Sequence, residues 1–248
     1  MGGKELGYAS DLDLVYLFDD DAMDAEENYT RLSQRLNSWL SSQTPAGILF
    51  ETDLRLRPNG DSGLLAVSVD AFRDYQLKHA WPWEHQALTR ARFCAGDPAV
   101  GRRFEEIRVE ILRLPRDLAK LKEDVVAMRQ KMYDAHALNS DTGFALKHDP
   151  GGIIDVEFIV QYLILGHAHQ YPELTGNLGN IALLRIAGEL GLIDPGQARA
   201  AGNAYREYRR LQHARRLSAT PKAPIPREEV EQHIAAVTTL WQAVLGGV

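Results

Sequence analysis

The sequence predicts an α+β fold in two parts: a mixed sheet with flanking helices over residues 1–105, and an all-helical bundle over residues 106–248. Apolar runs with the alternation of β-strands occur before about residue 98. Beyond it, apolar residues recur every three or four positions, as in amphipathic helices. A chain of 248 residues is long enough for one large domain or two modest ones.

The first part alternates strand and helix signals. Strands are expected at residues 12–18, 48–57 and 64–68. The last two are expected to form a hairpin across the turn at 58–63, which contains Asn59-Gly60. Helices are expected at residues 25–40, 70–77 and 83–94. The first of these would bury one face made of Tyr29, Leu32, Leu36 and Leu40, and Asp70 would cap the second.

The second part carries helix signals throughout. Apolar residues of one long helix face are spaced by three and four: Leu118, Leu121, Val125, Met128 and Met132. Further helices are expected at residues 153–165, 181–190, 195–217 and 227–244. The first of these is almost wholly apolar but too short to span a membrane, which indicates a buried helix. Three prolines in 219–226 predict a surface loop.

The composition argues against several classes of protein. The net charge of −6 argues against bulk binding of nucleic acid, which needs a basic face. The single cysteine, Cys94, excludes a disulfide framework and a thiolate metal site. The chain shows no membrane-spanning run and no signal peptide at its start. We therefore expect a cytoplasmic globular protein.

The run Ser10-Asp11-Leu12-Asp13 heads the first predicted strand. Because side chains alternate faces along a strand, Asp11 and Asp13 point to the same side. Neighbouring carboxylates repel each other unless a positive group lies between them, and a hard divalent cation is suited to that place. The alternative is an exposed strand end with two solvated acids, and the second acidic pair favours the metal site.

A second acidic pair, Glu51 and Asp53, lies on the next strand. Carboxylates on neighbouring strands would form a two-metal site for phosphoryl chemistry, and we favour Asp53 over Glu51 as the third ligand. Arg55 and Arg57 continue the same strand face. They suit phosphate oxygens, although ion pairs within the strand would also explain them.

Other residues are candidates for phosphate binding. The backbone of Gly2 and Gly3 can approach a phosphate closely, and Ser10 follows shortly after. Lys147 precedes a Gly-Gly turn that opens the apolar helix at 153–165, and it is a candidate for a triphosphate.

Asp155 and Glu157 lie in the first turns of that apolar helix. They could face a cleft between the two domains, or they could compensate the helix N-terminus, an interaction of about 0.3–1 kcal/mol. The residues alone leave both interpretations open.

Four ordered motifs carry a family resemblance across residues 2–158. They are Gly-Gly-x-Glu-Leu-Gly-Tyr-x-Ser-Asp-Leu-Asp-Leu, Asp-x-Arg-Leu-Arg-Pro-x-Gly, Trp-x-Trp-Glu-His-Gln-Ala-Leu-x-Arg-Ala-Arg and Gly-Gly-Ile-x-Asp-x-Glu-Phe. They resemble the glutamine synthetase adenylyltransferase/deadenylylase family, within the polymerase-β-like nucleotidyltransferase superfamily. Trp83-Glu84-His85-Gln86 and Gly47-Ile48-Leu49 resemble the C-terminal, adenylylating copy of that family's two catalytic domains.

The resemblance implies transfer of AMP from ATP to a tyrosine hydroxyl of glutamine synthetase, with release of pyrophosphate, in the regulation of nitrogen metabolism. Asp11, Asp13 and Asp53 map to the family's Mg²⁺ ligands and catalytic residues. Gly2, Gly3, Ser10, Arg55, Arg57 and Lys147 would bind the nucleotide. The PII signal protein would regulate the full-length enzyme.

The family places an apolar strand before the point where this sequence starts, so the resemblance also implies that the catalytic domain, residues 1–105, lacks its first strand. Two alternatives follow. The chain could remove AMP by phosphorolysis, because both catalytic copies share the acidic triad. It could also be a catalytically silent module that only binds glutamine synthetase or PII.

Overall fold

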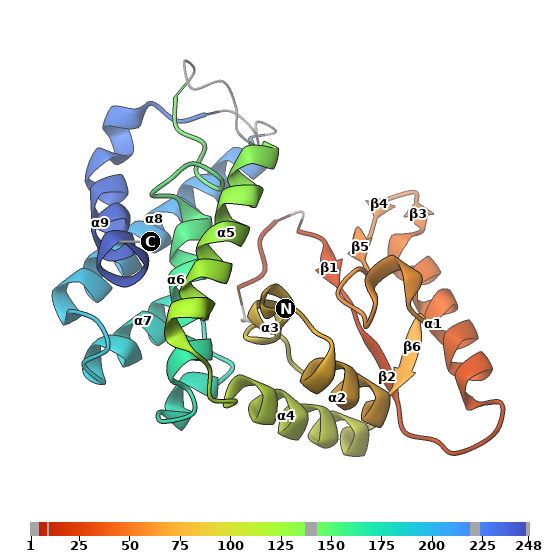
Figure 1. Cartoon of the computed structure of the whole chain (residues 1–248). Coiled ribbons are helices and arrows are strands. Elements are labelled where there is room, and N and C mark those ends of the chain that lie inside the picture. The colour runs from red at the N-terminus through yellow and green to blue at the C-terminus, as the bar shows by residue number, and fades with distance from the viewer. Residues whose placement is uncertain (1–4, 9, 137–142, 219–223, 247–248) are drawn as a thin grey trace. The chain divides into compact units, whose positions relative to one another are not determined.

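The structure, a computed structural model, describes residues 5–8, 10–136, 143–218 and 224–246. Its internal contacts divide these residues into two compact units (Figure 1). The first unit comprises residues 10–111, and the second comprises residues 112–246 together with the short segment 5–8. Small strand pairs lie among helices, so the predicted mixture of α and β structure is confirmed. The domain limits at residues 105 and 106 stay a prediction.

The strands of the first unit are short. They are β1 (Leu12–Asp13), β2 (Tyr16–Phe18), β3 (Gln43–Thr44), β4 (Gly47–Ile48), β5 (Thr52–Asp53) and β6 (Ala66–Ser68). β1 pairs with β5 and β2 pairs with β6, both in parallel, while β3 and β4 are antiparallel. The strand predicted over 12–18 is therefore two strands, β1 and β2, which pair with different partners.

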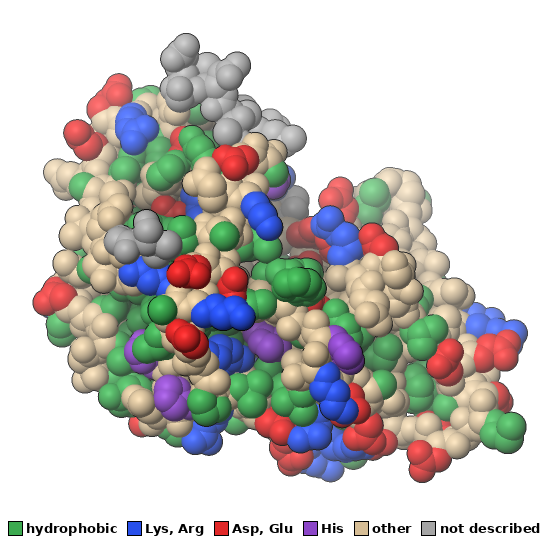
Figure 2. Space-filling model, viewed as in Figure 1, with side chains coloured by type: hydrophobic (Ala, Val, Ile, Leu, Met, Phe, Trp, Pro, Cys, Tyr) green, Lys and Arg blue, Asp and Glu red, His purple; other side chains and the backbone are tan. Residues whose placement is uncertain are grey.

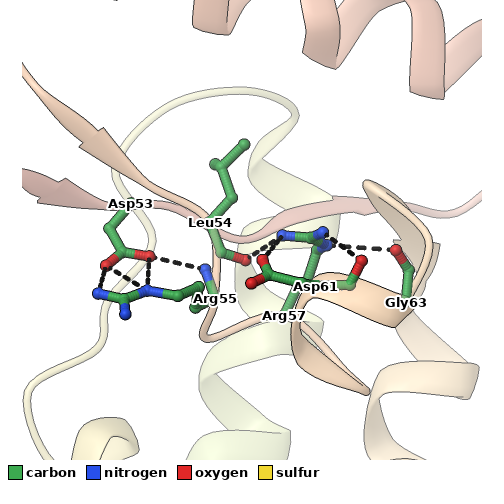
Figure 3. Close-up of polar contacts among 6 residues, drawn as sticks. All are labelled: Asp53, Leu54, Arg55, Arg57, Asp61 and Gly63. Atoms are coloured by element: carbon green, nitrogen blue, oxygen red, sulfur yellow. Dashed lines mark hydrogen bonds and ion pairs between the residues drawn. The ribbon is translucent and has the colours of Figure 1, made fainter.

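The hairpin predicted between residues 48–57 and 64–68 is wrong, because β6 pairs with β2 and not with β5. Asn59 and Gly60 have positive φ angles of 62° and 53°, and the 3₁₀ turn η1 (Gly60–Ser62) follows. Arg57 lies inside this loop and donates to the backbone carbonyls of Leu54 at 2.7 Å and Gly63 at 3.3 Å (Figure 3). The loop is thus closed by a side chain and not by a two-residue turn.

Four helices of the first unit are α1 (Ala25–Ser41), α2 (Val69–Lys78), α3 (Pro82–Leu88) and α4 (Pro98–Leu112). The extent predicted for α1 is confirmed, but its predicted apolar face is only partly correct. Ala25 and Ser33 are buried, and Tyr29 stacks on Phe18 with ring centroids 4.8 Å apart. Leu32 is exposed, and its neighbour Ser33 is buried in its place, whereas Leu36 and Leu40 of the predicted face are half-buried.

The prediction that Asp70 caps the second helix is wrong. Ser68 caps α2, since its hydroxyl accepts a hydrogen bond from the Ala71 N–H at 3.2 Å. Asp70 lies within the first turn and forms an ion pair with Arg103 of α4 at 2.6 Å. That contact links two helices that are distant in sequence.

Helix α3 ends at Leu88, six residues before the predicted end at Cys94. The buried Arg108 of α4 donates to the carbonyls of Leu88 at 2.9 Å and Thr89 at 3.0 Å. Because a longer helix needs those carbonyls for its own hydrogen bonds, Arg108 favours a stop at this position.

The second unit is helical in its described residues, apart from one isolated bridge between Phe144 and Ile225. Its elements are α5 (Leu118–His136), α6 (Ile153–His167), η3 (Pro172–Thr175), α7 (Asn180–Glu189), α8 (Pro195–Leu217) and α9 (Arg227–Leu245). The helices predicted in this part are confirmed to within a few residues. The predicted loop at 219–226 lies mostly outside the described residues.

Helix α6 forms the centre of this unit. Between Ile153 and Gly166, every residue except Glu157 and Gln161 is buried. α5 packs on α6, and α8 packs on both α7 and α9 (Figure 1). Among the described helices, none combines the length and the apolar character needed to cross a membrane. On the face of the molecule in Figure 2, acidic and basic side chains are interspersed, in keeping with the modest net charge.

Candidate active site: carboxylates and an arginine at strands β1 and β5

The parallel pair β1 and β5 places Asp13 opposite Asp53 in register. The backbone N–H of Leu12 donates to the Glu51 carbonyl, and that of Leu14 donates to the Asp53 carbonyl, both at 2.9 Å. Leu12 is buried, and its side chain points away from the face that carries its neighbours along the strand. Because Leu12 packs into the apolar interior, the carboxylates of Asp11 and Asp13 lie on the opposite face of the strand.

Asp11 belongs to the same acidic cluster. The pKa of Asp13 is raised above its ordinary value, first by burial and then by the nearby carboxylates of Asp11 and Asp53. The cluster therefore concentrates negative charge, which would favour binding of a cation.

Asp53 is bound by Arg55 (Figure 3). One carboxylate oxygen accepts the backbone N–H of Arg55 at 2.8 Å, and Nε of Arg55 reaches the two oxygens at 3.1 and 2.9 Å. Nη2 of Arg55 also donates to Asp53. These hydrogen bonds lower the pKa of Asp53 below its ordinary value. The side chain of Arg55 is 73% exposed, so it covers the carboxylate from the solvent side.

The donor set of this cluster suits a hard divalent cation, because it consists of carboxylate oxygens. Across the described residues, no three Asp, Glu, His or Cys side chains converge as they would in a formed metal centre. Arg55 binds the Asp53 oxygens that a cation would need. Asp11, Asp13 and Asp53 thus fit a metal by their chemistry, provided that Asp53 exchanges Arg55 for the ion.

The other predicted nucleotide-binding residues of the first unit differ in their surroundings. Arg57 is largely buried by the loop that it closes, and it also donates to the Asp61 carbonyl at 3.2 Å (Figure 3). A phosphate role for Arg57 would compete with these bonds, whereas Arg55 is accessible. Ser10 is half-buried and lies two residues before the start of β1. Gly2 and Gly3 lie outside the described residues.

Lys147 and Asp155, the candidates before and within the predicted apolar helix, belong to the second unit, where that helix is α6. Lys147 is exposed in the turn before α6. Asp155 is buried and forms an ion pair with Arg129 at 2.5 Å, and it also accepts the Gly151 N–H at 2.6 Å. Burial raises the pKa of Asp155. These contacts favour the interpretation in which the Asp155 carboxylate compensates the N-terminus of α6.

Comparison with protein families gives two adjoining matches. Residues 1–107 match the family described as glutamate-ammonia ligase adenylyltransferase. Residues 119–235 match the family described as GlnD PII-uridylyltransferase. The first part of the chain is thus similar to a family named for an adenylyltransferase, and the second part to a family named for a uridylyltransferase.

Curated relatives are similar along nearly the whole chain. Proteins named bifunctional glutamine synthetase adenylyltransferase/adenylyl-removing enzyme match 99% of it in Aromatoleum aromaticum at 65% identity, in Bordetella bronchiseptica at 58% and in Nitrosomonas europaea at 56%. The chain covers 26%, 26% and 28% of these relatives, respectively, so it spans about a quarter of their length.

Proposed function

We propose that the chain belongs to the glutamine synthetase adenylyltransferase family and that it transfers AMP from ATP to a tyrosine hydroxyl of glutamine synthetase and releases pyrophosphate. The observation that carries the proposal is the acidic cluster at β1 and β5, where Asp13 and Asp53 lie in register and Asp11 adds a third charge. It lies within the part of the chain that matches the adenylyltransferase family. We also propose the polymerase-β-like fold for this part.

Asp11, Asp13 and Asp53 would hold Mg²⁺, and Arg55 and Ser10 would bind phosphate oxygens, with Gly2, Gly3, Arg57 and Lys147 as further candidates. When bound, the ions would neutralise phosphate charge and lower the pKa of the acceptor hydroxyl. Asp53 would accept the proton of that hydroxyl, and Arg55 would move from Asp53 to the phosphates. A guanidinium presents donors in a planar fork that matches phosphate oxygens.

Glutamine synthetase is the protein substrate in this proposal, and PII is a candidate regulator of the longer enzyme. The test incubates the chain with labelled ATP, Mg²⁺ and unmodified glutamine synthetase and analyses the target by mass spectrometry. An AMP adduct on a tyrosine is expected. A parallel reaction supplies adenylylated glutamine synthetase and phosphate. Removal of AMP there, without transfer in the first reaction, would contradict the proposed direction.

The contact between Arg55 and Asp53 predicts a competition that can be measured without turnover. Because Arg55 binds the oxygens that a cation needs, Arg55→Gln is expected to strengthen Mn²⁺ binding in the absence of nucleotide by about two- to fivefold, the range of an exposed ion pair. The same variant is expected to bind ATP more weakly. Mn²⁺ titration followed by electron paramagnetic resonance measures the first effect, and calorimetry measures the second.

Arg31→Gln is the matched control, since Arg31 forms an exposed ion pair with Glu27 on α1. It removes the same charge from the same unit and is expected to leave both affinities unchanged. Equal Mn²⁺ affinity in Arg55→Gln and Arg31→Gln would show that Arg55 does not compete for the Asp53 oxygens.

A further inference from the structure

The chain leaves β5 through a loop, residues 54–63, that one side chain closes from within (Figure 3). Nη1 of Arg57 donates to the carbonyl of Leu54, the residue directly after Asp53, at 2.7 Å. Nη2 and Nε of the same side chain donate to the carbonyls of Asp61 at 3.2 Å and Gly63 at 3.3 Å. Only 13% of the Arg57 side chain is exposed, so the guanidinium forms the interior of the loop.

The backbone of the loop folds tightly around this guanidinium. The Gly60 N–H donates to the Arg57 carbonyl at 2.9 Å, and the Gly63 N–H donates to the Gly60 carbonyl at 3.1 Å. A Cβ on Gly63 would collide with the carbonyl oxygen of Pro58. If Arg57 left the loop to bind a phosphate, three backbone carbonyls would lose their donor, which favours a fixed place for its side chain.

A second contact holds the loop from α2. Burial raises the pKa of Tyr75, and a hydrogen bond from the backbone N–H of Asn59 opposes that shift. The Tyr75 hydroxyl donates to the carboxylate of the buried Glu84 at 2.9 Å. Glu84 also accepts the Trp81 N–H at 2.8 Å, at the start of α3. The loop is thus tied to two helices of its own unit.

The closed loop is joined directly to the acidic cluster. The Asp53 carbonyl accepts the Leu14 N–H at 2.9 Å, which is a bond between β5 and β1. The next carbonyl along the chain, that of Leu54, accepts Arg57. The strand pairing therefore passes without a gap into the contacts of the loop.

We propose that Arg57 is a positioning residue for the acidic cluster: by closing the loop after β5, it determines where that strand ends and thus where Asp53 faces Asp13. This role differs from the phosphate contact that the family resemblance implies for Arg57. Displacements of about 1 Å at a catalytic group can reduce the rate by about 100-fold. The inference rests on the proposed function for its effect on AMP transfer, but not for its effect on β5 or on cation binding.

The experiment compares two charge-conserving variants of the full chain. Arg57→Lys keeps the positive charge but lacks the planar fork that reaches three carbonyls at once. Since lysine still binds phosphate as a point charge, a phosphate ligand at this position would tolerate the change. Arg73→Lys is the matched control, because the Arg73 guanidinium of α2 binds the Glu110 carboxylate of α4 in the same unit, at 2.7 Å.

A milder pair of variants tests the loop without touching a charge. Tyr75→Phe removes the hydroxyl that lies between Asn59 and Glu84. Tyr29→Phe is its control, since the Tyr29 hydroxyl donates to Asp20 at 3.1 Å in the same unit. This pair decides the question by the same measurements if Arg57→Lys does not fold.

Hydrogen exchange at the Leu14 amide reports how well the end of β5 is held. Arg57→Lys is expected to speed this exchange by about tenfold, and Tyr75→Phe by about threefold. Mn²⁺ binding without nucleotide, followed by electron paramagnetic resonance, is expected to weaken by about tenfold in Arg57→Lys. Arg73→Lys and Tyr29→Phe are expected to leave both quantities unchanged.

Transfer kinetics separate positioning from phosphate binding. At saturating Mg²⁺, Arg57→Lys is expected to lower kcat for transfer by about 10- to 100-fold. Its KM for ATP is expected to stay within about twofold of that of the unchanged chain.

Equal Leu14 exchange and equal Mn²⁺ affinity in Arg57→Lys and Arg73→Lys would overturn the positioning role. Weaker ATP binding in Arg57→Lys with Leu14 exchange unchanged would overturn it as well, in favour of a phosphate contact. The exchange and Mn²⁺ measurements need no turnover. If the unchanged chain transfers no AMP but Arg57→Lys still loosens β5 and weakens Mn²⁺ binding, the proposed function fails and the positioning role stands.

Discussion

Asp13→Asn is expected to reduce the proposed AMP transfer by about 1000-fold or more, because losing one of the carboxylates proposed to bind Mg²⁺ would remove several kcal/mol of transition-state stabilisation. The same substitution is expected to leave the first unit as stable as before, or slightly more so. Asp13 lies close to the carboxylates of Asp11 and Asp53, so its own charge is repelled in the folded state. Asparagine keeps the shape of the side chain and removes that repulsion.

Three measurements on one variant check this result. Transfer to glutamine synthetase is measured with labelled ATP, stability is measured by thermal unfolding, and cation binding is measured as the rise in unfolding temperature with added Mg²⁺. The unchanged chain is expected to gain stability with Mg²⁺ by mass action, and Asp13→Asn is expected to gain much less.

Asp21→Asn is the control for charge. Asp21 is an exposed carboxylate in the stretch between β2 and α1, in the same unit as the acidic cluster. It is expected to behave as the unchanged chain in all three measurements. A rate for Asp13→Asn close to that of Asp21→Asn would exclude Asp13 from the catalytic machinery.

The second large effect concerns stability. Asp155→Ala is expected to destabilise the helical unit by about 3–5 kcal/mol, because it leaves the buried guanidinium of Arg129 without its counterion. Both side chains are only 7% exposed. The Gly151 N–H would lose its acceptor as well. The cost therefore combines an unpaired charge with an unsatisfied backbone donor.

Hydrogen exchange of α6 peptides under increasing urea measures this effect, since the two units need not unfold in one step. Glu189→Ala is the matched control, because Glu189 pairs with Arg185 on the surface of α7, with side chains about 60% exposed. It is expected to cost less than about 1 kcal/mol. If Asp155→Ala cost no more than this control, the buried ion pair would not stabilise the unit. Replacing both partners, Arg129→Met with Asp155→Leu, is expected to recover much of the loss.

The sequence predicts the helices of the second unit to within a few residues because their signals are local. The apolar stretch of α6 and the spacing of Leu121 and Val125 on α5 depend on residues within a few turns of each other. The alternation of apolar residues before about residue 98 also predicts the mixed character of the first unit. The alternation of side chains along a strand likewise predicts that Asp11 and Asp13 share a strand face.

Three predictions for the first unit failed for different reasons. Ser68 takes the capping role that was predicted for Asp70, although this cap is a local contact with Ala71. The other two depend on distant partners: the chain at 64–68 pairs with β2 and not with β5, and α3 stops at Leu88 because Arg108 reaches back from α4. Both depend on which groups meet after the chain has folded. Neither the alternation of a strand nor the period of a helix contains that information.

The candidate site likewise has features that the sequence predicts and features that only the tertiary structure decides. The sequence by itself determined the acidic residues, their spacing and the motifs that resemble the glutamine synthetase adenylyltransferase family. Tertiary structure alone decided that Asp13 faces Asp53 in register, that Arg55 covers Asp53, and that Glu5 is seated between α7 and α8. Glu5 stands within a motif quoted for the family resemblance, but its contacts could not be predicted, since its partners lie 175 and 200 positions further along the chain. Local propensities act over a few residues, whereas these contacts form only when folding brings distant segments of the chain together.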